Sequence, residues 1–247
     1  MNEDPFSLAG RRLLVTGASS GLGRAIAIAC ASRGARIVAT GRDEPRLSET
    51  RAELAGEGHA TVAADLNDAA GRDQVVGAAG TLDGVVHSAG ISRLSPMRLA
   101  TPQHLADVWK INYEAPMLLT QKLLAKNQVA ANGSILFMSS IAAYIGVAGV
   151  GAYSGTKAAL IATMRCMAME VAKRGIRVNC LAPALVETPL LAATETVVAS
   201  LDEQRAAYPL GFGKPADVAN AAVFFLCGAS RWITGTTLVM DGGLTIS

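Results

Sequence analysis

Charged and aromatic residues are scarce in this chain of 247 residues. Asp, Glu, Lys and Arg make up 17% of it, Phe, Trp and Tyr 4%, and the formal net charge is only +2. No run of Lys or Arg stands out, which argues against a nucleic acid as the main partner. Hydrophobic residues reach 51%, so the composition is that of a globular chain and not of a disordered one.

Long apolar runs and metal-binding patterns are also missing. No stretch is long and apolar enough to cross a bilayer, and the first residues, MNEDPFSLAGRR, lack the basic and apolar regions of a signal peptide. The cysteines and histidines show no ligand spacing: Cys30, Cys166, Cys180, Cys227, His59, His87 and His104. We therefore expect no membrane partner, no metal, and free thiols in a reducing compartment, the cytoplasm.

A glycine-rich turn, GASSGLG, lies between the apolar run Leu13–Thr16 and a stretch of helical spacing that stops at Gly34. Strand, turn and helix in this order are the context of a dinucleotide-binding loop. Gly17 would permit the tight turn, Gly21 the approach of a pyrophosphate, and Gly23 the packing of helix on strand. The helix N-terminus would offer free N–H groups and the positive end of its dipole to the phosphates.

The second predicted strand, 35–40, ends at Gly41-Arg42-Asp43. In a dinucleotide fold an acidic residue here binds the 2′-hydroxyl of NAD, whereas an arginine accommodates the 2′-phosphate of NADP. Gly41 occupies the acidic position and Arg42 follows, so we expect NADP, with NAD as the alternative. Asp43 competes for the acidic role, but it stands where the next helix would have its N-cap.

Further apolar runs predict strands that alternate with helical segments: 59–64, 82–87, 133–138, 175–181 and 236–240. No break in composition interrupts them. The pattern predicts a single doubly wound α/β domain over residues 1–247, with a mainly parallel seven-stranded sheet and helices on both faces. Asp65 ends the first of these runs, at the ligand edge of the sheet. It could bond an adenine amino group or cap the helix that starts near Asp68.

Two segments of the predicted fold are irregular. A helix is expected from Thr101, its N-cap, to about Lys126, with Pro116 bending it and disturbing the hydrogen-bond ladder near Asn112. Residues 185–214 contain two prolines and less regular spacing, which makes them a candidate substrate-binding segment or lid.

A tyrosine and a lysine, Tyr153 and Lys157, stand four residues apart, and Ser140 precedes the tyrosine by thirteen. On a helix this spacing brings the phenol and the ammonium to one face, where the lysine is expected to lower the pKa of the tyrosine toward neutrality. The tyrosine could then transfer protons, and a serine hydroxyl could bind a carbonyl oxygen. Ser139 is the alternative serine, but the thirteen-residue distance favours Ser140. Such a pair alone is also common on helix surfaces.

Together, Thr16-Gly-x3-Gly-x-Gly23, Asn112, Ser140 and Tyr153-x3-Lys157 resemble the motifs of the classical short-chain dehydrogenase/reductases. The likeness runs from about Leu8 to the final Asp241-Gly-Gly, and is greatest to the 3-oxoacyl-carrier-protein-reductase-like branch. It implies an oxidoreductase that interconverts a ketone and a secondary alcohol. Tyr153 would be the general acid and base, Lys157 would hold the nicotinamide ribose, Ser140 would bind the substrate oxygen, and Asn112 would hold a water of a proton relay.

The resemblance also implies a set of cofactor-binding residues. They are Gly17, Ser19, Ser20, Gly21, Leu22, Gly23, Arg42, Asp65, Leu66, Ser88, Ala89, Gly90, Tyr153, Lys157, Pro183, Val186 and Thr188. Three features depart from the family pattern. The glycine turn carries no lysine or arginine, which many NADP-preferring members have there, so the NADP prediction rests on Arg42 and on the absence of an acid at Gly41. The usual Asn-Asn-Ala-Gly is His87-Ser88-Ala89-Gly90, so its hydrogen bonds must be made differently, and the usual Pro-Gly is Pro183-Ala184.

The candidate pocket residues, 91–94, 141, 144–147 and 185–212, are largely apolar. We expect a small hydrophobic or lightly polar carbonyl or alcohol substrate, such as a 3-oxoacyl thioester. The family likeness implies a homo-oligomer, a dimer or tetramer, with the helices of Asn112 and Tyr153 between subunits and small residues at Ala158, Ala162 and Ala168. The alternative is a non-catalytic nucleotide-sensing or scaffold protein on the same fold, which would typically have lost Ser140, Tyr153 or Lys157.

Overall fold

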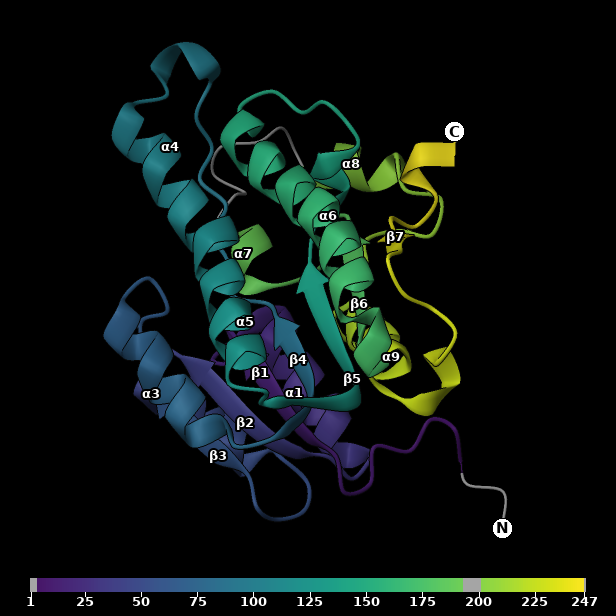
Figure 1. Ribbon diagram of the computed structural model, residues 1–247. Coiled ribbons are helices and arrows are strands. Elements are labelled where there is room, and N and C mark those ends of the chain that lie inside the picture. The colour runs from purple at the N-terminus through teal and green to yellow at the C-terminus, as the bar shows by residue number, and fades with distance from the viewer. Residues whose placement is uncertain (1–3, 193–200, 247) are drawn as a thin grey trace.

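The computed structural model describes residues 4–192 and 201–246 of the chain. Within them one sheet has the strand order β3-β2-β1-β4-β5-β6-β7, and every neighbouring pair is parallel (Figure 1). The strands are β1 Arg12–Thr16, β2 Arg36–Gly41, β3 Ala60–Ala63, β4 Leu82–His87, β5 Val129–Met138, β6 Arg177–Pro183 and β7 Thr237–Met240. The predicted doubly wound α/β fold is confirmed.

Helices cover both faces of the sheet. They are α1 Gly21–Ser32, α2 Glu44–Ala52, α3 Ala69–Ala79, α4 Pro102–Trp109, α5 Ala115–Ala125, α6 Gly151–Val171, α7 Pro189–Ala192, α8 Leu201–Ala206 and α9 Pro215–Leu226. Figure 1 shows α3, α5 and α6 in front of the sheet, with α1 behind it. In residues 4–192 and 201–246 no helix is long and apolar enough to cross a membrane.

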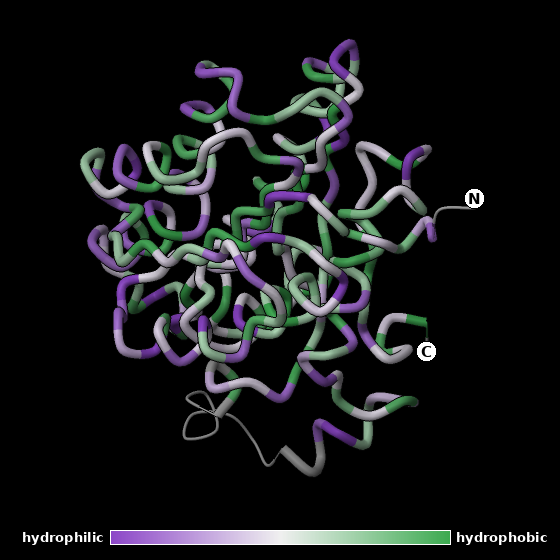
Figure 2. The backbone as a smooth tube through the Cα atoms, turned by 90° about the horizontal axis from the view of Figure 1, so that it is seen from below, coloured by the Kyte–Doolittle hydropathy of each residue, from purple (hydrophilic) through white to green (hydrophobic). Residues whose placement is uncertain are grey.

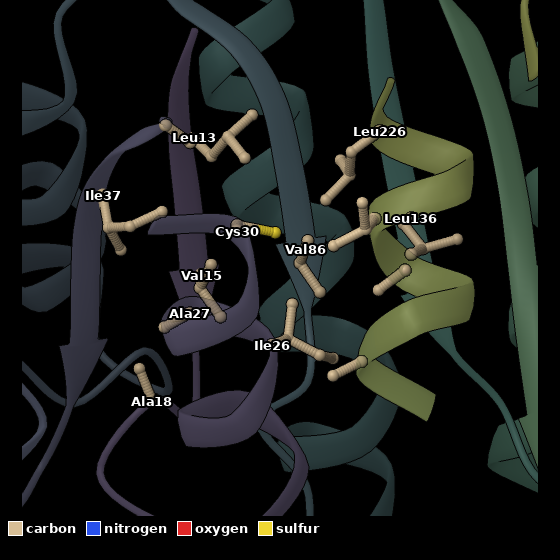
Figure 3. Close-up of a cluster of buried hydrophobic side chains, with 14 of the residues drawn as sticks. Leu13, Val15, Ala18, Ile26, Ala27, Cys30, Ile37, Val86, Leu136 and Leu226 are labelled. Atoms are coloured by element: carbon tan, nitrogen blue, oxygen red, sulfur yellow. The ribbon is translucent and has the colours of Figure 1, made fainter. Parts of the chain in front are cut away.

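Two apolar cores lie between these layers. One packs the sheet against α1 and α9, where Ile26 and Cys30 meet Val86 and Leu136 (Figure 3). The other packs it against α3, α5 and α6. Val85 and Val86 enter opposite cores, because successive strand residues face opposite sides of a sheet. In Figure 2 green and pale tube runs through much of the middle, and purple marks several outer turns.

The strand order reverses between β1 and β4, and there the chain segments approach very closely. The hydroxyl of Thr16 accepts hydrogen bonds from the N–H groups of Ser88 and Ala89, each at 3.1 Å. A Cβ atom on Gly17 would lie 2.8 Å from Cα of Ala89, and one on Gly23 would lie 2.3 Å from the Gly17 carbonyl oxygen. Both positions require glycine, because any side chain would push the turn off the sheet. A ligand crevice is expected at such a reversal.

Several predicted helix starts are confirmed. The Asp43 carboxylate accepts a hydrogen bond from the Arg46 N–H at 3.0 Å and caps α2, and the Thr101 hydroxyl caps α4 in the same way. Asp65 behaves differently. Its carboxylate accepts from the N–H of Asn67 at 2.9 Å, in the turn before α3, so the suggestion that it caps that helix is wrong.

The helix expected from Thr101 to Lys126 is interrupted. A π turn, Lys110–Glu114, separates α4 from α5, and the Ala115 N–H bonds the Lys110 carbonyl five residues back. Pro116 lies in the first turn of α5. Because proline has no N–H, the carbonyl of Asn112 loses the donor that a regular α-helix would supply. The predicted disturbance near Asn112 is therefore confirmed, and Asn112 itself is buried.

The segment 185–214 is more ordered than its sequence suggested, although residues 193–200 of this candidate lid lie outside the described part. Val186 pairs with Gly213 in an isolated parallel bridge, and α7 and α8 follow. The Arg205 guanidinium lies 2.9 Å from a Glu187 carboxylate oxygen and 4.6 Å from the centroid of the Phe212 ring. These contacts hold the two described flanks of the segment together.

His87 ends β4 in the second core. Its ring stacks on Phe137 with centroids 4.8 Å apart, and its Nε2 lies 2.7 Å from the Thr120 hydroxyl oxygen. At this position, where the family pattern has asparagine, the side chain of this protein bonds to α5. Burial away from water lowers the pKa of His87 to about 3.

This burial predicts an acid-sensitive fold. Between the ordinary pKa of 6.5 and about 3, the unfolded chain binds a proton that folded His87 does not, so stability is lost as the pH falls through that window. From pH 7 to pH 5 the loss should be about 2 kcal/mol. Urea unfolding of wild type and His87→Leu at both pH values should show that the variant lacks this component. His104→Ala, at a half-buried position, should retain it, and an equal loss in wild type and His87→Leu would contradict the prediction.

Candidate active site

A cleft of about 1110 Å³ runs along the carboxyl ends of the strands, from the glycine-rich turn to the segment after β6. Every residue predicted to bind the cofactor lines it, and so do Ser140, Tyr153 and Lys157. Asn112 lies behind the wall and not on it. In the described parts of the chain no group of three His, Cys, Asp or Glu residues could hold a metal ion.

The turn after β1 fits a diphosphate. Helix α1 begins at Gly21, and the Ser20 side chain makes no capping bond to its first turn, which also carries no acidic residue. The N–H groups of that turn can therefore serve a ligand. A Cβ on Gly21 would have no atom nearer than 3.9 Å, so the space above the turn is open to the cleft. Gly21 also has a φ of +54°, a conformation that favours glycine.

A smaller polar pocket adjoins the cleft beyond Arg42. It is lined by Ser19, Ser20, Arg42, Asp43, Glu44, Pro45 and Arg46. Asp43 is engaged in capping α2 and lies 3.4 Å from the Arg46 guanidinium, and it does not line the main cleft, whereas Arg42 does. The arrangement suits an anionic group beside Arg42 better than a hydroxyl bound by Asp43.

Tyr153, Lys157 and Ser140 meet where the cleft passes the end of β5. Tyr153 and Lys157 lie in the first two turns of α6, and the Lys157 ammonium is 5.4 Å from the centroid of the Tyr153 ring. The Ser140 hydroxyl shares a hydrogen bond with the phenol. Ser139 instead donates its hydroxyl to the Lys157 carbonyl at 2.9 Å, so Ser140 is the serine placed beside the tyrosine.

The pKa values of this group differ from the expectation. Burial raises the pKa of Tyr153, and the hydrogen bond to Ser140 lowers it by less. Lys157 donates to the Met138 carbonyl at 2.8 Å, and burial lowers its pKa to about 8. The predicted fall in the pKa of Tyr153 is therefore wrong for the chain alone. Removal from water disfavours the phenolate more than the hydrogen bond to Ser140 favours it.

Asn112 joins the π turn to the loop after β4. Its Oδ1 accepts the Ile91 N–H at 2.8 Å, and its Nδ2 donates to the Ile91 carbonyl at 3.0 Å and to Thr156 at 3.3 Å. Gly90 lies between Asn112 and Lys157. A Cβ on Gly90 would be 3.1 Å from Asn112 Oδ1 and 3.6 Å from Lys157 Nζ. Glycine at this position keeps a gap between the two side chains.

The remaining walls of the cleft are mostly apolar. Ile91, Ser92, Leu94, Ile141, Ile145, Val147, Leu185, Leu191 and Tyr208 line it as predicted. Several predicted residues do not line it. Among them, Arg93 pairs with Asp107 at 2.9 Å, Tyr144 is 52% exposed, and Phe212 packs edge-on against Tyr208. Of the described residues that line the cleft, the charged ones are Arg42, Asp65 and Lys157.

Some lining residues were missed from the sequence. Pro96 and Val150 reach the cleft because the Ser95 N–H bonds the Gly149 carbonyl at 2.8 Å, which joins two loops distant in sequence. Leu244 arrives from the C-terminal end, where the Leu210 N–H bonds the Gly242 carbonyl. Both contacts are long-range backbone pairings, and no local pattern marks them.

Comparisons with known proteins agree with this geometry. Residues 17–245 match the family described as enoyl-(acyl carrier protein) reductase. A D-threitol dehydrogenase of Mycolicibacterium smegmatis is 35% identical over 98% of this chain and 95% of its own length. A short-chain glucose/ribitol dehydrogenase structure from Brucella melitensis superimposes with a TM-score of 0.92, 30% identity and coverage of 99% of this chain and 100% of its own.

A second structure from Brucella melitensis, a 3-ketoacyl-(acyl-carrier-protein) reductase complexed with NADH, has a TM-score of 0.87 and 32% identity. It covers 97% of this chain and 100% of its own. The matches extend over nearly the whole chain, both in sequence and in fold. The chain therefore belongs to the short-chain dehydrogenase/reductase family.

Proposed function

We propose that this protein is an NADP-dependent oxidoreductase that interconverts a ketone and a secondary alcohol. The observation that carries the proposal is the meeting of Tyr153, Ser140 and Lys157 on one wall of the cleft whose other end holds the glycine turn and Arg42. A dinucleotide laid along the cleft would reach both places. A non-catalytic nucleotide sensor on the same fold is disfavoured, because it would not need this trio.

Bound NADPH supplies the hydride, and the residues of the chain manage the proton and the substrate oxygen. In reduction Tyr153 donates its phenolic proton to the carbonyl oxygen, and in oxidation the phenolate takes that proton back. Ser140 donates a hydrogen bond to the same oxygen. Because burial raises the pKa of Tyr153, the phenol is protonated at neutral pH and ready to act as the acid. Lys157 stays largely charged below a pKa of about 8 and favours the phenolate once it forms.

The substrate class follows from the uncharged walls. Beyond Tyr153 the described wall residues are mainly Leu, Ile, Val, Pro and Ala, with no charged side chain among them. A hydrophobic ketone, including a 3-oxoacyl thioester, gains apolar burial there of about 0.8 kcal/mol per methylene. In the described wall a sugar acid's carboxylate would face no cationic side chain beyond Tyr153, and the hydroxyl groups of a polyol would find few polar side chains, among them Ser92, Gln204 and Tyr208.

We also propose that the protein forms homo-oligomers in the cytoplasm. Helices α4 and α6 lie together and expose apolar side chains, among them Leu105, Trp109 and Met169, the last 79% exposed. Ala158 and Ala162 are exposed on α6, as close helix packing requires, but Ala168 is buried in the core and belongs to another face. Cys30, Cys166, Cys180 and Cys227 are free thiols, which favours a reducing compartment.

The acid–base role predicts the effect of Tyr153→Phe. The variant should lose about 10²- to 10⁴-fold in kcat, because proton transfer from a positioned side chain contributes about that much. NADPH affinity, measured by fluorescence titration, should change by no more than about threefold, since the glycine turn and Arg42 remain. Normal turnover by Tyr153→Phe would show that the mechanism is wrong.

Cofactor choice should depend on Arg42. Loss of a charge-assisted hydrogen bond predicts that Arg42→Ala weakens NADPH binding by about 10- to 100-fold and leaves NADH binding nearly unchanged. Arg51→Ala, in the last turn of α2 and exposed, is the matched control and should keep the wild-type preference. An unchanged preference in Arg42→Ala would remove Arg42 from the site.

Substrate preference can be measured with 2-octanone, an acetoacetyl thioester and dihydroxyacetone, by following the loss of NADPH absorbance. We expect kcat/KM for 2-octanone or the thioester to exceed that for dihydroxyacetone at least about tenfold, from the burial of two or more methylenes. A higher kcat/KM for dihydroxyacetone would contradict the apolar assignment while leaving the oxidoreductase function intact.

A further inference from the structure

His87 is a buried polar side chain that the proposed mechanism does not use. It lies at the wall of the cleft together with Ser88, Ala89 and Gly90, which follow it in the chain. Its Nε2 is 2.7 Å from the Thr120 hydroxyl oxygen, and that oxygen is 2.8 Å from the Pro116 carbonyl. A carbonyl can only accept, so the single hydroxyl hydrogen of Thr120 is directed to Pro116. His87 must then donate its Nε2–H to Thr120.

This tautomer leaves Nδ1 of His87 as a bare acceptor. It is buried and has no partner among the described residues. An unpaired buried acceptor destabilises a fold, and an apolar side chain of similar shape would avoid that cost. Stability alone therefore does not account for a histidine here, and the bond that it donates to Thr120 gives it a different role.

The bond fixes one particular turn. Pro116 lies in the first turn of α5, immediately after the π turn that carries Asn112, and Thr120 lies one turn further along the helix. The Asn112 side-chain amide bonds the Ile91 backbone twice: its Oδ1 accepts from the N–H and its Nδ2 donates to the carbonyl. The segment from α4 to α5 is thus hydrogen-bonded at two points to β4 and the loop that follows it. Thr120 bonds His87 at the end of β4, and Asn112 bonds Ile91 in the loop. The π turn therefore lies between two hydrogen-bonded attachments.

We propose that His87 is a positioning residue that acts through Thr120 to hold Asn112 in place. The hydrogen bond between His87 and Thr120 keeps the Asn112 side-chain amide bonded to Ile91. It also preserves the gap at Gly90 between Asn112 and Lys157. The proposal rests on the proposed function, together with the proton relay through Asn112 that the resemblance to the family implies.

The test uses two matched variants of the full-length protein. Thr120→Val keeps the side-chain shape and removes the hydroxyl, and Thr120→Ser keeps the hydroxyl. We expect Thr120→Val to lower kcat at least about fivefold with the NADPH dissociation constant within about twofold of wild type, because only proton delivery is affected. Thr120→Ser should stay within about twofold of wild type in both.

Hydrogen–deuterium exchange without cofactor or substrate supplies a second readout. Peptides that cover residues 88–93 and 109–116 should exchange faster in Thr120→Val and at the wild-type rate in Thr120→Ser. Peptides from α9 should be unchanged in both. His87→Leu should reproduce the effects on kcat and exchange, and the double variant should be no worse than either single variant, as expected for two residues acting as one unit.

Wild-type kcat and exchange in Thr120→Val would overturn the proposal. An equal loss in Thr120→Ser, or additive effects of His87→Leu and Thr120→Val, would also overturn it. If the wild-type enzyme shows no turnover that depends on Tyr153, the proposed function fails instead. The exchange comparison then still decides whether His87 and Thr120 hold the π turn.

Discussion

The close contact between the turn after β1 and the end of β4 is the constraint on which the site depends. The Thr16 hydroxyl accepts hydrogen bonds from the N–H groups of Ser88 and Ala89 in the neighbouring loop. This close approach leaves no room for a side chain at Gly17. The two halves of the sheet are joined at this point. As a result the N-terminus of α1, the loop that carries Gly90 and the end of β5 face one cleft. Backbone packing brings these groups close together, so the site is already arranged before a ligand binds.

The sequence allowed prediction of features that depend on a few neighbouring residues. The glycine turn, the caps at Asp43 and Thr101, and the disturbed helix before Pro116 all belong to this class, because short-range sterics and hydrogen bonding decide them. The order and spacing of the motif residues also predicted which residues would line the cleft near the glycine turn. Features set by distant segments were out of reach. Leu244 and Pro96 enter the cleft through long-range backbone bonds, and Arg93 leaves it for an ion pair with Asp107.

The pKa of Tyr153 shows a different limit. The spacing to Lys157 predicted a charge effect, but it contained no information on how far the fold withdraws the phenol from water. In the folded chain both groups shift toward their neutral forms. The protein alone thus presents a proton donor and not a proton acceptor, a state that matches the start of a reduction. Oxidation requires the phenolate, which this environment disfavours.

The crowding at Gly41 has a consequence for how such an enzyme can change over evolution. A Cβ at this position would lie 3.1 Å from the Ser19 hydroxyl oxygen, so a side chain there requires Ser19 to shift by a few tenths of an ångström. We therefore expect positions 19 and 41 to be coupled in evolution, although they stand 22 positions apart in the sequence. A replacement at one position changes which residues the other accepts, so the order in which two such mutations arise matters.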